Sequence, residues 1–157
     1  MPFLTGEATY ALAWSRGERM LALPPLPSRD VLLLLPPFGV PTAEAYGRLA
    51  ASRDAWRPRG RVRHADDLLD WDSVAAAAGN DFEPIVQDWH PDLRACVAWL
   101  VRRGASPAML SGSGSVVFGV LADGSGVGDA RDDAPPAGCR LLRTRTLSRV
   151  VAVERIG

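Results

Sequence analysis

The segment Leu110-Ser111-Gly112-Ser113-Gly114-Ser115 places two glycines and three hydroxyl side chains between two apolar stretches. Glycine accepts positive φ and lets a ligand approach the backbone closely, so successive N–H groups can point at an anion. The hydroxyls of Ser111, Ser113 and Ser115 add further donors. The pattern predicts an anion-binding loop. A plain hairpin turn is the alternative that the residues leave open.

The loop departs from the familiar phosphate and nucleophile motifs. A G-x-x-x-x-G-K phosphate loop needs a lysine, but all 18 basic residues of the chain are arginines. The absence of lysine also excludes Schiff-base chemistry and a lysine general base. Each serine has a glycine beside it, which rules out a G-x-S-x-G nucleophile elbow. Val117 stands where a dinucleotide G-x-G-x-x-G pattern needs its third glycine.

A second polar cluster is Asn80-Asp81-Phe82-Glu83-Pro84. It can orient a ligand hydroxyl or a cation. The spacing favours a structural role, in which Asn80 or Asp81 caps the following helix and Glu83 completes a capping box.

Two further charged groups are interpreted as structural. His64, Asp66 and Asp67 match no metal-site spacing, so no metal site is predicted. The alternating arginines from Arg57 to Arg63 precede an acidic run, which indicates a self-neutralising solvated loop rather than a phosphate or RNA site.

Composition describes one ordinary folded domain. The chain has 157 residues, is 47% hydrophobic, and balances 18 basic against 18 acidic side chains. We therefore expect no general affinity for nucleic acid or an acidic membrane. The apolar run Val31–Leu35 is far too short to cross a membrane, and no leader is visible, so a cytoplasmic location is expected. Cys96 and Cys139 are expected as free thiols, with Cys96 a small buried hydrophobe.

The hydrophobic pattern predicts alternating groups of strands and helices. Strands are expected over residues 8–14, 19–23, 30–35, 107–110, 116–121, 140–146 and 149–156, and helices over 42–52, 72–78, 80–87 and 91–103. In the last helix one apolar stripe is formed by Leu93, Cys96, Val97, Leu100 and Val101. The order predicts an α+β fold, a largely antiparallel sheet with helices on one face.

Segments between these elements complete the organisation. Residues 1–28 are interpreted as an N-terminal hairpin and connector, and 53–72 and 123–138 as variable loops. Thr42 is expected to cap the helix that begins near it.

Several segments, taken in order, resemble the C-terminal half of the 4-diphosphocytidyl-2-C-methyl-D-erythritol kinase family, a branch of the GHMP kinase superfamily. The resemblance rests on Pro2–Gly6, Tyr10–Glu18, Pro37–Tyr46, Asn80–Pro84, Leu110–Phe118 and Arg145–Ser148. It covers essentially the whole of residues 1–157.

The resemblance implies a fold and a reaction. The fold is the ferredoxin-like C-terminal domain of a two-domain kinase whose active site lies between its halves. The reaction moves the γ-phosphoryl group of ATP, with Mg²⁺, to the 2-hydroxyl of the cytidine-diphosphate-linked methylerythritol, in the non-mevalonate route to isoprenoid precursors. By resemblance, Ser111–Ser115 corresponds to the superfamily's third conserved motif and Thr42 to a threonine near the catalytic centre.

The family pattern also shows what these residues lack. The family's catalytic lysine, its ATP-wrapping loop and its catalytic aspartate lie upstream of the position that matches Met1. Residues 123–138 are rich in glycine and proline where the family has a helix. We therefore expect no catalytic residue and no tightly bound cofactor in this chain. The expected partners are an N-terminal kinase half, or a second copy of the chain, and a small-molecule substrate. The alternative is a non-catalytic ferredoxin-like binding or interaction module.

Overall fold

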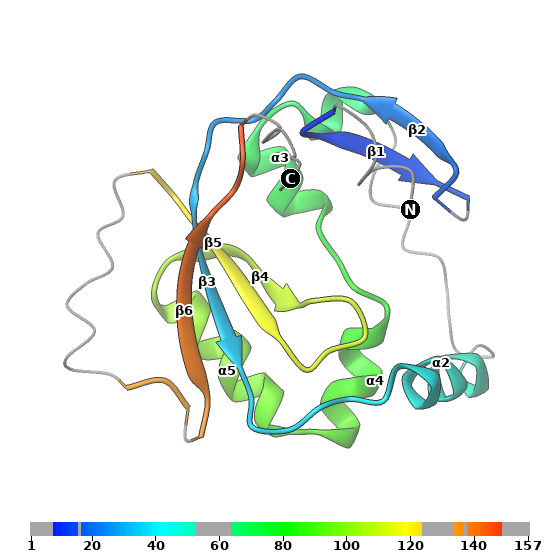
Figure 1. Cartoon of the computed structure of the whole chain (residues 1–157), viewed down its shortest axis with the longest axis vertical. Coiled ribbons are helices and arrows are strands. Elements are labelled where there is room, and N and C mark those ends of the chain that lie inside the picture. Colours follow the sequence, from blue (N-terminus) through cyan, green and yellow to red (C-terminus); the bar gives the residue numbers. More distant parts are fainter. Residues whose placement is uncertain (1–7, 16, 53–63, 124–133, 137, 149–157) are drawn as a thin grey trace, which may run out of the picture.

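The computed structural model describes residues 8–15, 17–52, 64–123, 134–136 and 138–148. Two short strands, β1 (Ala11–Trp14) and β2 (Arg19–Ala22), pair as an antiparallel hairpin apart from the main sheet (Figure 1). The turn between them contains Ser15 and Gly17, both with positive φ. The predicted N-terminal hairpin is thereby confirmed within its described part.

A four-stranded antiparallel sheet forms the centre of the molecule. It contains β3 (Asp30–Leu35), β4 (Ala105–Leu110), β5 (Val117–Leu121) and β6 (Arg140–Arg145), in the order β4-β5-β3-β6. β3 is a central strand, as its almost unbroken apolar sequence predicts. The predicted α+β class with an antiparallel sheet is confirmed.

The helices pack against this sheet and against one another. They are α2 (Thr42–Ala51), α3 (Trp71–Ala77), α4 (Phe82–Trp89) and α5 (Asp92–Arg102), with a 3₁₀ helix η2 at Ala65–Leu68. α5 lies behind the sheet in Figure 1 and contacts β4 and β5. α4 packs against α5 and β4, and α2 packs against α4. This chain of contacts connects the start of α2 to the end of β4.

The core lies between α5 and one face of the sheet. Trp99 and Leu100 of α5 are fully buried with Leu32 and Leu34 of β3. The sequence-based prediction was wrong for Val101, which is 55% exposed, whereas Trp99 is 1% exposed. Successive helical residues are rotated by about 100°. The buried face is centred between Trp99 and Leu93, so Val101 points away from the sheet.

Parts of the predicted organisation fall on residues that the structure does not describe. These are the strand over 149–156, the arginines of 57–63 and most of the loop 123–138. In the described part of 53–72, η2 buries Leu68. Within the described ranges, no helix has the length and apolar character that crossing a membrane requires.

Close packing of α5 on β5 predicts a strong effect of Gly119→Ala. The added Cβ would lie 2.6 Å from the Cβ of Ala105 and 3.2 Å from that of Leu100. We expect a loss of more than about 2 kcal/mol in the free energy of unfolding, because the core must expand. The matched control is Gly47→Ala on the exposed side of α2, where nothing lies within 4 Å. It should stabilise by about 0.5–1 kcal/mol. Equal denaturation midpoints for the two variants would contradict this packing.

Candidate functional site

The loop between β4 and β5 has the backbone geometry that its glycines predict. Gly112 has φ +55° and Gly114 has φ +94°, and the Gly114–Ser115 peptide bond is cis. The Gly114 N–H donates to the carbonyl of Ser111 at 2.9 Å, and the Ser111 N–H donates to the carbonyl of Val116 at 2.8 Å. The loop is thus closed by two internal hydrogen bonds.

Three amides of the loop have no hydrogen-bond partner among the described residues. Among the described residues, no acceptor pairs with the N–H of Gly112, Ser113 or Ser115. The prediction that successive loop amides point at an anion is therefore wrong for Ser111 and Gly114, whose N–H groups close the turn. The loop combines a hairpin closure with three unpaired donors, so its geometry leaves the anion-binding role available.

Asn80 holds the loop from the side of α4. Its amide Nδ2 donates to the carbonyl of Leu110 at 2.9 Å and to the carbonyl of Gly112 at 2.7 Å. Its Oδ1 accepts from the N–H of Phe82 at 3.0 Å, at the start of α4. One side chain therefore ties the start of a helix to two carbonyls of the loop.

Glu83 binds the backbone N–H of Leu110, the last residue of β4, whose carbonyl is bound by Asn80. Its Oε2 accepts from the N–H of Leu110 at 2.8 Å, and its Oε1 accepts from Gln87 at 3.1 Å. We call the side chains of Asn80 and Glu83 the α4 clamp. The prediction that Asn80 caps the start of α4 is confirmed by its bond with the Phe82 N–H, but the capping box is wrong, because the Glu83 carboxylate binds Leu110 across the tertiary structure. The N-cap residue of α4, Asp81, makes no side-chain cap bond.

The opposite side of the loop contacts the segment between β3 and α2. The hydroxyl of Ser115 donates to the carbonyl of Phe38 at 2.5 Å. The hydroxyls of Thr42 and Ser113 lie 3.1 Å apart. Thr42 was predicted as a helix cap, which is wrong: Pro41 is the N-cap, with no side-chain cap bond, and Thr42 is the first helical residue. Its hydroxyl faces the loop, so two sequence-predicted site residues meet across 71 positions of chain.

These contacts bring the start of α2 to the loop. The positive end of a helix dipole and unpaired N–H groups both favour an anion. Thr42 and Gly112 are exposed, while Ser113 and Ser115 are half-buried. The arrangement can hold phosphate oxygens through backbone amides and hydroxyls, and no lysine takes part.

Carboxylates of the described residues do not converge as metal ligands. No group of three or more histidine, cysteine, aspartate or glutamate side chains is placed to hold a metal ion within those ranges. Near His64, the carboxylate of Asp67 instead accepts from the His64 N–H at 3.1 Å.

Comparison with known proteins agrees with this fold. Residues 65–137 match the family model described as GHMP kinases C terminal. A solved structure titled as 4-(cytidine 5'-diphospho)-2C-methyl-D-erythritol kinase matches with a TM-score of 0.66 and 24% identity, over 91% of this chain and 51% of that one. This likeness concerns the fold. Over residues 65–137 the chain is thus similar to the C-terminal domain of the GHMP kinases.

Two curated relatives share a more particular name. The 4-diphosphocytidyl-2-C-methyl-D-erythritol kinase of Heliobacterium modesticaldum is 35% identical over 98% of this chain and 55% of its own length. The kinase of the same name from Solibacter usitatus is 37% identical over 77% of this chain and 39% of its own length. The chain thus spans about half the length of these relatives or less.

The α4 clamp predicts that removing the side chain of Asn80 costs more stability than removing that of its neighbour Asp81. Asn80→Ala removes the donor to two loop carbonyls and should lower the free energy of unfolding by about 1–3 kcal/mol. Asp81→Ala is the matched control: its side chain is exposed and makes no cap bond, so we expect a change within about 0.5 kcal/mol. Chemical denaturation of both variants measures the difference, and similar losses would refute the clamp.

The two loop glycines should differ in their tolerance of a side chain. At Gly112 a Cβ meets nothing within 4 Å, so Gly112→Ala should cost about 1 kcal/mol for its positive φ alone. At Gly114 the Cβ would lie 3.1 Å from Leu110 Cδ1, which adds crowding, and we expect a loss above about 2 kcal/mol. Gly39→Ala, with open space and no positive φ, is the control. A smaller loss at Gly114 than at Gly112 would contradict this geometry.

Proposed function

We propose that this chain is the C-terminal part of an ATP-dependent kinase. The kinase phosphorylates the 2-hydroxyl of 4-diphosphocytidyl-2-C-methyl-D-erythritol in the non-mevalonate route to isoprenoid precursors, in the cytoplasm. The observation that carries the proposal is the Ser111–Ser115 loop, whose two glycines have positive φ and which lies against Thr42. The substrate is taken from the name that the relatives share. One of these relatives matches 98% of this chain.

In this proposal the loop binds phosphate oxygens. The unpaired amides of Gly112, Ser113 and Ser115 supply donors that need no reorganisation, because the α4 clamp already fixes the backbone. The hydroxyls of Thr42 and Ser113 lie close enough to share one oxygen. Phosphoryl transfer depends largely on positioning and charge stabilisation. The Ser111–Ser115 loop and Thr42 can therefore contribute to catalysis without supplying a nucleophile or a base.

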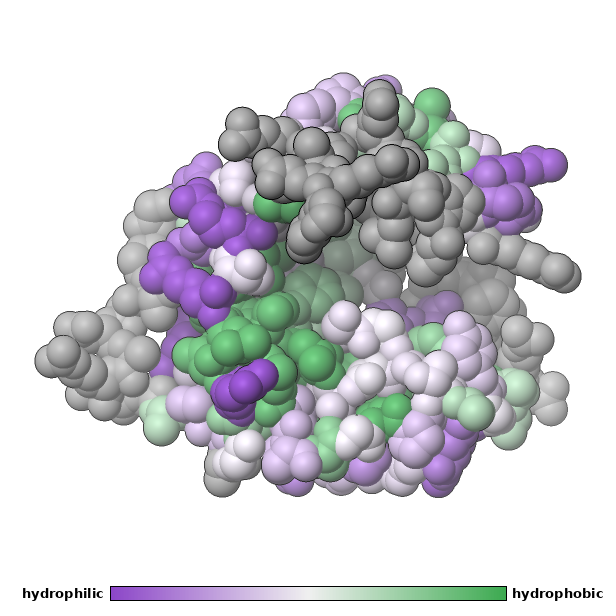
Figure 2. Space-filling view, in the orientation of Figure 1, coloured by the Kyte–Doolittle hydropathy of each residue, from purple (hydrophilic) through white to green (hydrophobic). Residues whose placement is uncertain are grey.

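The rest of the catalytic machinery must come from another polypeptide segment. These 157 residues contain no lysine, and the family resemblance implies that the catalytic aspartate also belongs to the N-terminal half. We propose that an N-terminal kinase half docks on this domain. Exposed apolar side chains favour such a partner: Trp14 and Leu21 on the hairpin are each 45% exposed, and Leu142 on β6 is 40% exposed. Figure 2 shows apolar residues gathered on the visible face of the molecule, beside its central hollow.

Complementation tests this function directly. The 157-residue chain is mixed with a separately produced N-terminal half of the Heliobacterium modesticaldum kinase, and substrate-dependent ADP release is followed. We expect no activity above background for either half alone, and restored activity for the mixture. Activity of this chain alone would contradict the assignment of the catalytic groups to another segment. Failure of every N-terminal half tried, while the cytidine-diphosphate substrate still binds, would favour the non-catalytic module.

Variants then locate the contribution of the loop. In the active mixture, Ser113→Ala and Thr42→Val should each lower kcat/KM by about tenfold, since each removes a hydroxyl donor worth ~1.4 kcal/mol. Ser52→Ala, whose hydroxyl only donates to the carbonyl of Leu49 in α2, is the matched control and should leave kcat/KM unchanged. Unchanged turnover in both loop variants would remove the loop from the site.

A further inference from the structure

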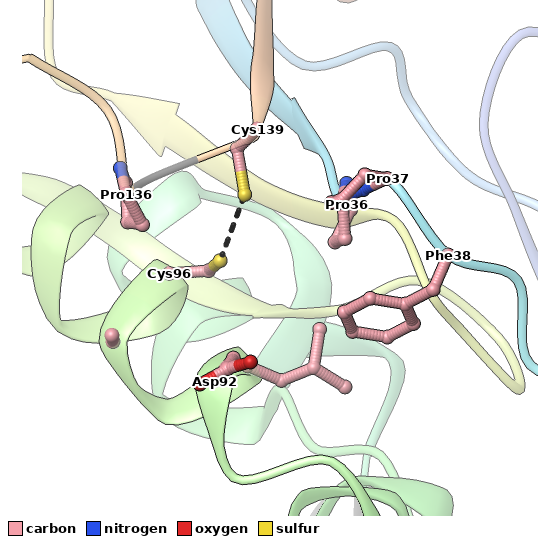
Figure 3. A pocket seen from close by; sticks show the side chains of 9 residues that line it. Pro36, Pro37, Phe38, Asp92, Cys96, Pro136 and Cys139 are labelled. Atoms are coloured by element: carbon pink, nitrogen blue, oxygen red, sulfur yellow. Dashed lines mark hydrogen bonds between the residues drawn. The ribbon is translucent and has the colours of Figure 1, made fainter.

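The two cysteines of the chain lie together, far from each other in sequence. Cys96 belongs to α5 and is 1% exposed, whereas Cys139 precedes β6 and is half-buried. Their Sγ atoms are 3.6 Å apart, and both are free thiols. Figure 3 shows the two sulfur atoms facing one another, Cys96 from α5 and Cys139 from the segment just before β6.

A pocket opens at this pair. It has a volume of about 280 Å³ and is lined by both cysteines together with Pro36, Pro37, Phe38, Asp92, Leu93, Ala95 and Pro136. The walls are mainly apolar, and Asp92 is the charged side chain among them. The space suits a small uncharged molecule, which could reach a sulfur atom without unfolding the domain.

The backbone just before Cys139 is held in place by one hydrogen bond and by close packing. Its N–H donates to the carbonyl of Pro136 at 2.9 Å. Gly138 has φ +79° and packs so closely that an added Cβ would lie 3.2 Å from Pro37. The two sulfur atoms therefore belong to packed parts of the fold, namely α5 and the segment before β6. A disulfide bond is about 2.05 Å long, so the sulfurs need to approach by about 1.5 Å.

We propose that Cys96 and Cys139 form a dithiol modification site that a small aliphatic disulfide entering this pocket oxidises to an intramolecular disulfide. This inference is independent of the proposed kinase role.

The reaction proceeds by thiol–disulfide exchange in two balanced steps. The Cys139 thiolate attacks one sulfur of the small disulfide, whose S–S bond breaks and releases one thiolate. The Cys96 thiol then loses its proton to solvent base and attacks the Cys139 sulfur, which releases the second thiolate. Two protein thiols are oxidised by two electrons, and the small disulfide is reduced to two thiols.

The order of attack follows from the surroundings of each sulfur. Burial above all, and then the hydrogen bond with Cys139, raise the pKa of Cys96 to about 12, so at neutral pH Cys96 is a protonated thiol. Cys139 is only half-buried and lines the pocket, so its sulfur atom is the more accessible of the two. Ring closure by Cys96 should accelerate as the pH rises above neutral, because more of its thiolate forms.

Intact-mass measurement with 2-hydroxyethyl disulfide tests the site. The wild-type chain should form a mixed disulfide and then lose it, ending lighter by two hydrogen atoms. Cys96→Ser should stop at the mixed disulfide, because the resolving thiol is absent. Cys139→Ser should react at least ~10-fold more slowly, because Cys96 is buried. Circular dichroism verifies that all three proteins are folded, and all thiols should react alike in denaturant.

The possible outcomes decide the proposal. Faster ring closure in the wild-type chain at higher pH, with the trapped adduct only in Cys96→Ser, supports it. The proposal is overturned if the wild-type chain remains a mixed disulfide or forms disulfide-linked dimers. It is also overturned if Cys139→Ser reacts as fast as Cys96→Ser.

Discussion

The backbone of Leu110, at the end of β4, is bound on both of its polar groups by the α4 clamp. Its N–H donates to Glu83 and its carbonyl accepts from Asn80. A buried strand end that leaves its sheet must find partners for these groups, and an unpaired group costs as much as a lost hydrogen bond. The clamp supplies both partners and so fixes where the loop leaves the sheet. The position of the Ser113 hydroxyl against Thr42, and of Ser115 against Phe38, depends on that departure point.

Phe38 connects the loop to the second cluster of reactive side chains. Its carbonyl accepts from Ser115, and its ring lines the pocket beside Cys96 and Cys139. The same short segment after β3 therefore borders both the candidate phosphate loop and the dithiol site.

Local sequence patterns predict most elements of this fold but not their tertiary partners. The apolar run of β3 and the boundaries of α5 follow from periodicity and from Pro91 and Gly104. The conformations of Gly112 and Gly114 follow from their spacing between two strands. The tertiary contacts of Thr42 and Glu83 do not follow, because both residue types also suit a helix start. Only the packing of α4 on β4, and of α2 on α4, decides that their side chains face the loop.

The central claim is that the Ser111–Ser115 loop is preorganised to bind an anion, and amide chemical shifts test it most directly. The ¹⁵N-labelled chain is titrated with inorganic pyrophosphate at constant ionic strength, with sodium chloride as the reference. The claim predicts saturable shifts of the Gly112, Ser113 and Ser115 amides, and smaller shifts of Ser111 and Gly114, whose N–H groups are bonded within the turn. Unmoved loop amides, or equal shifts with chloride, would contradict it.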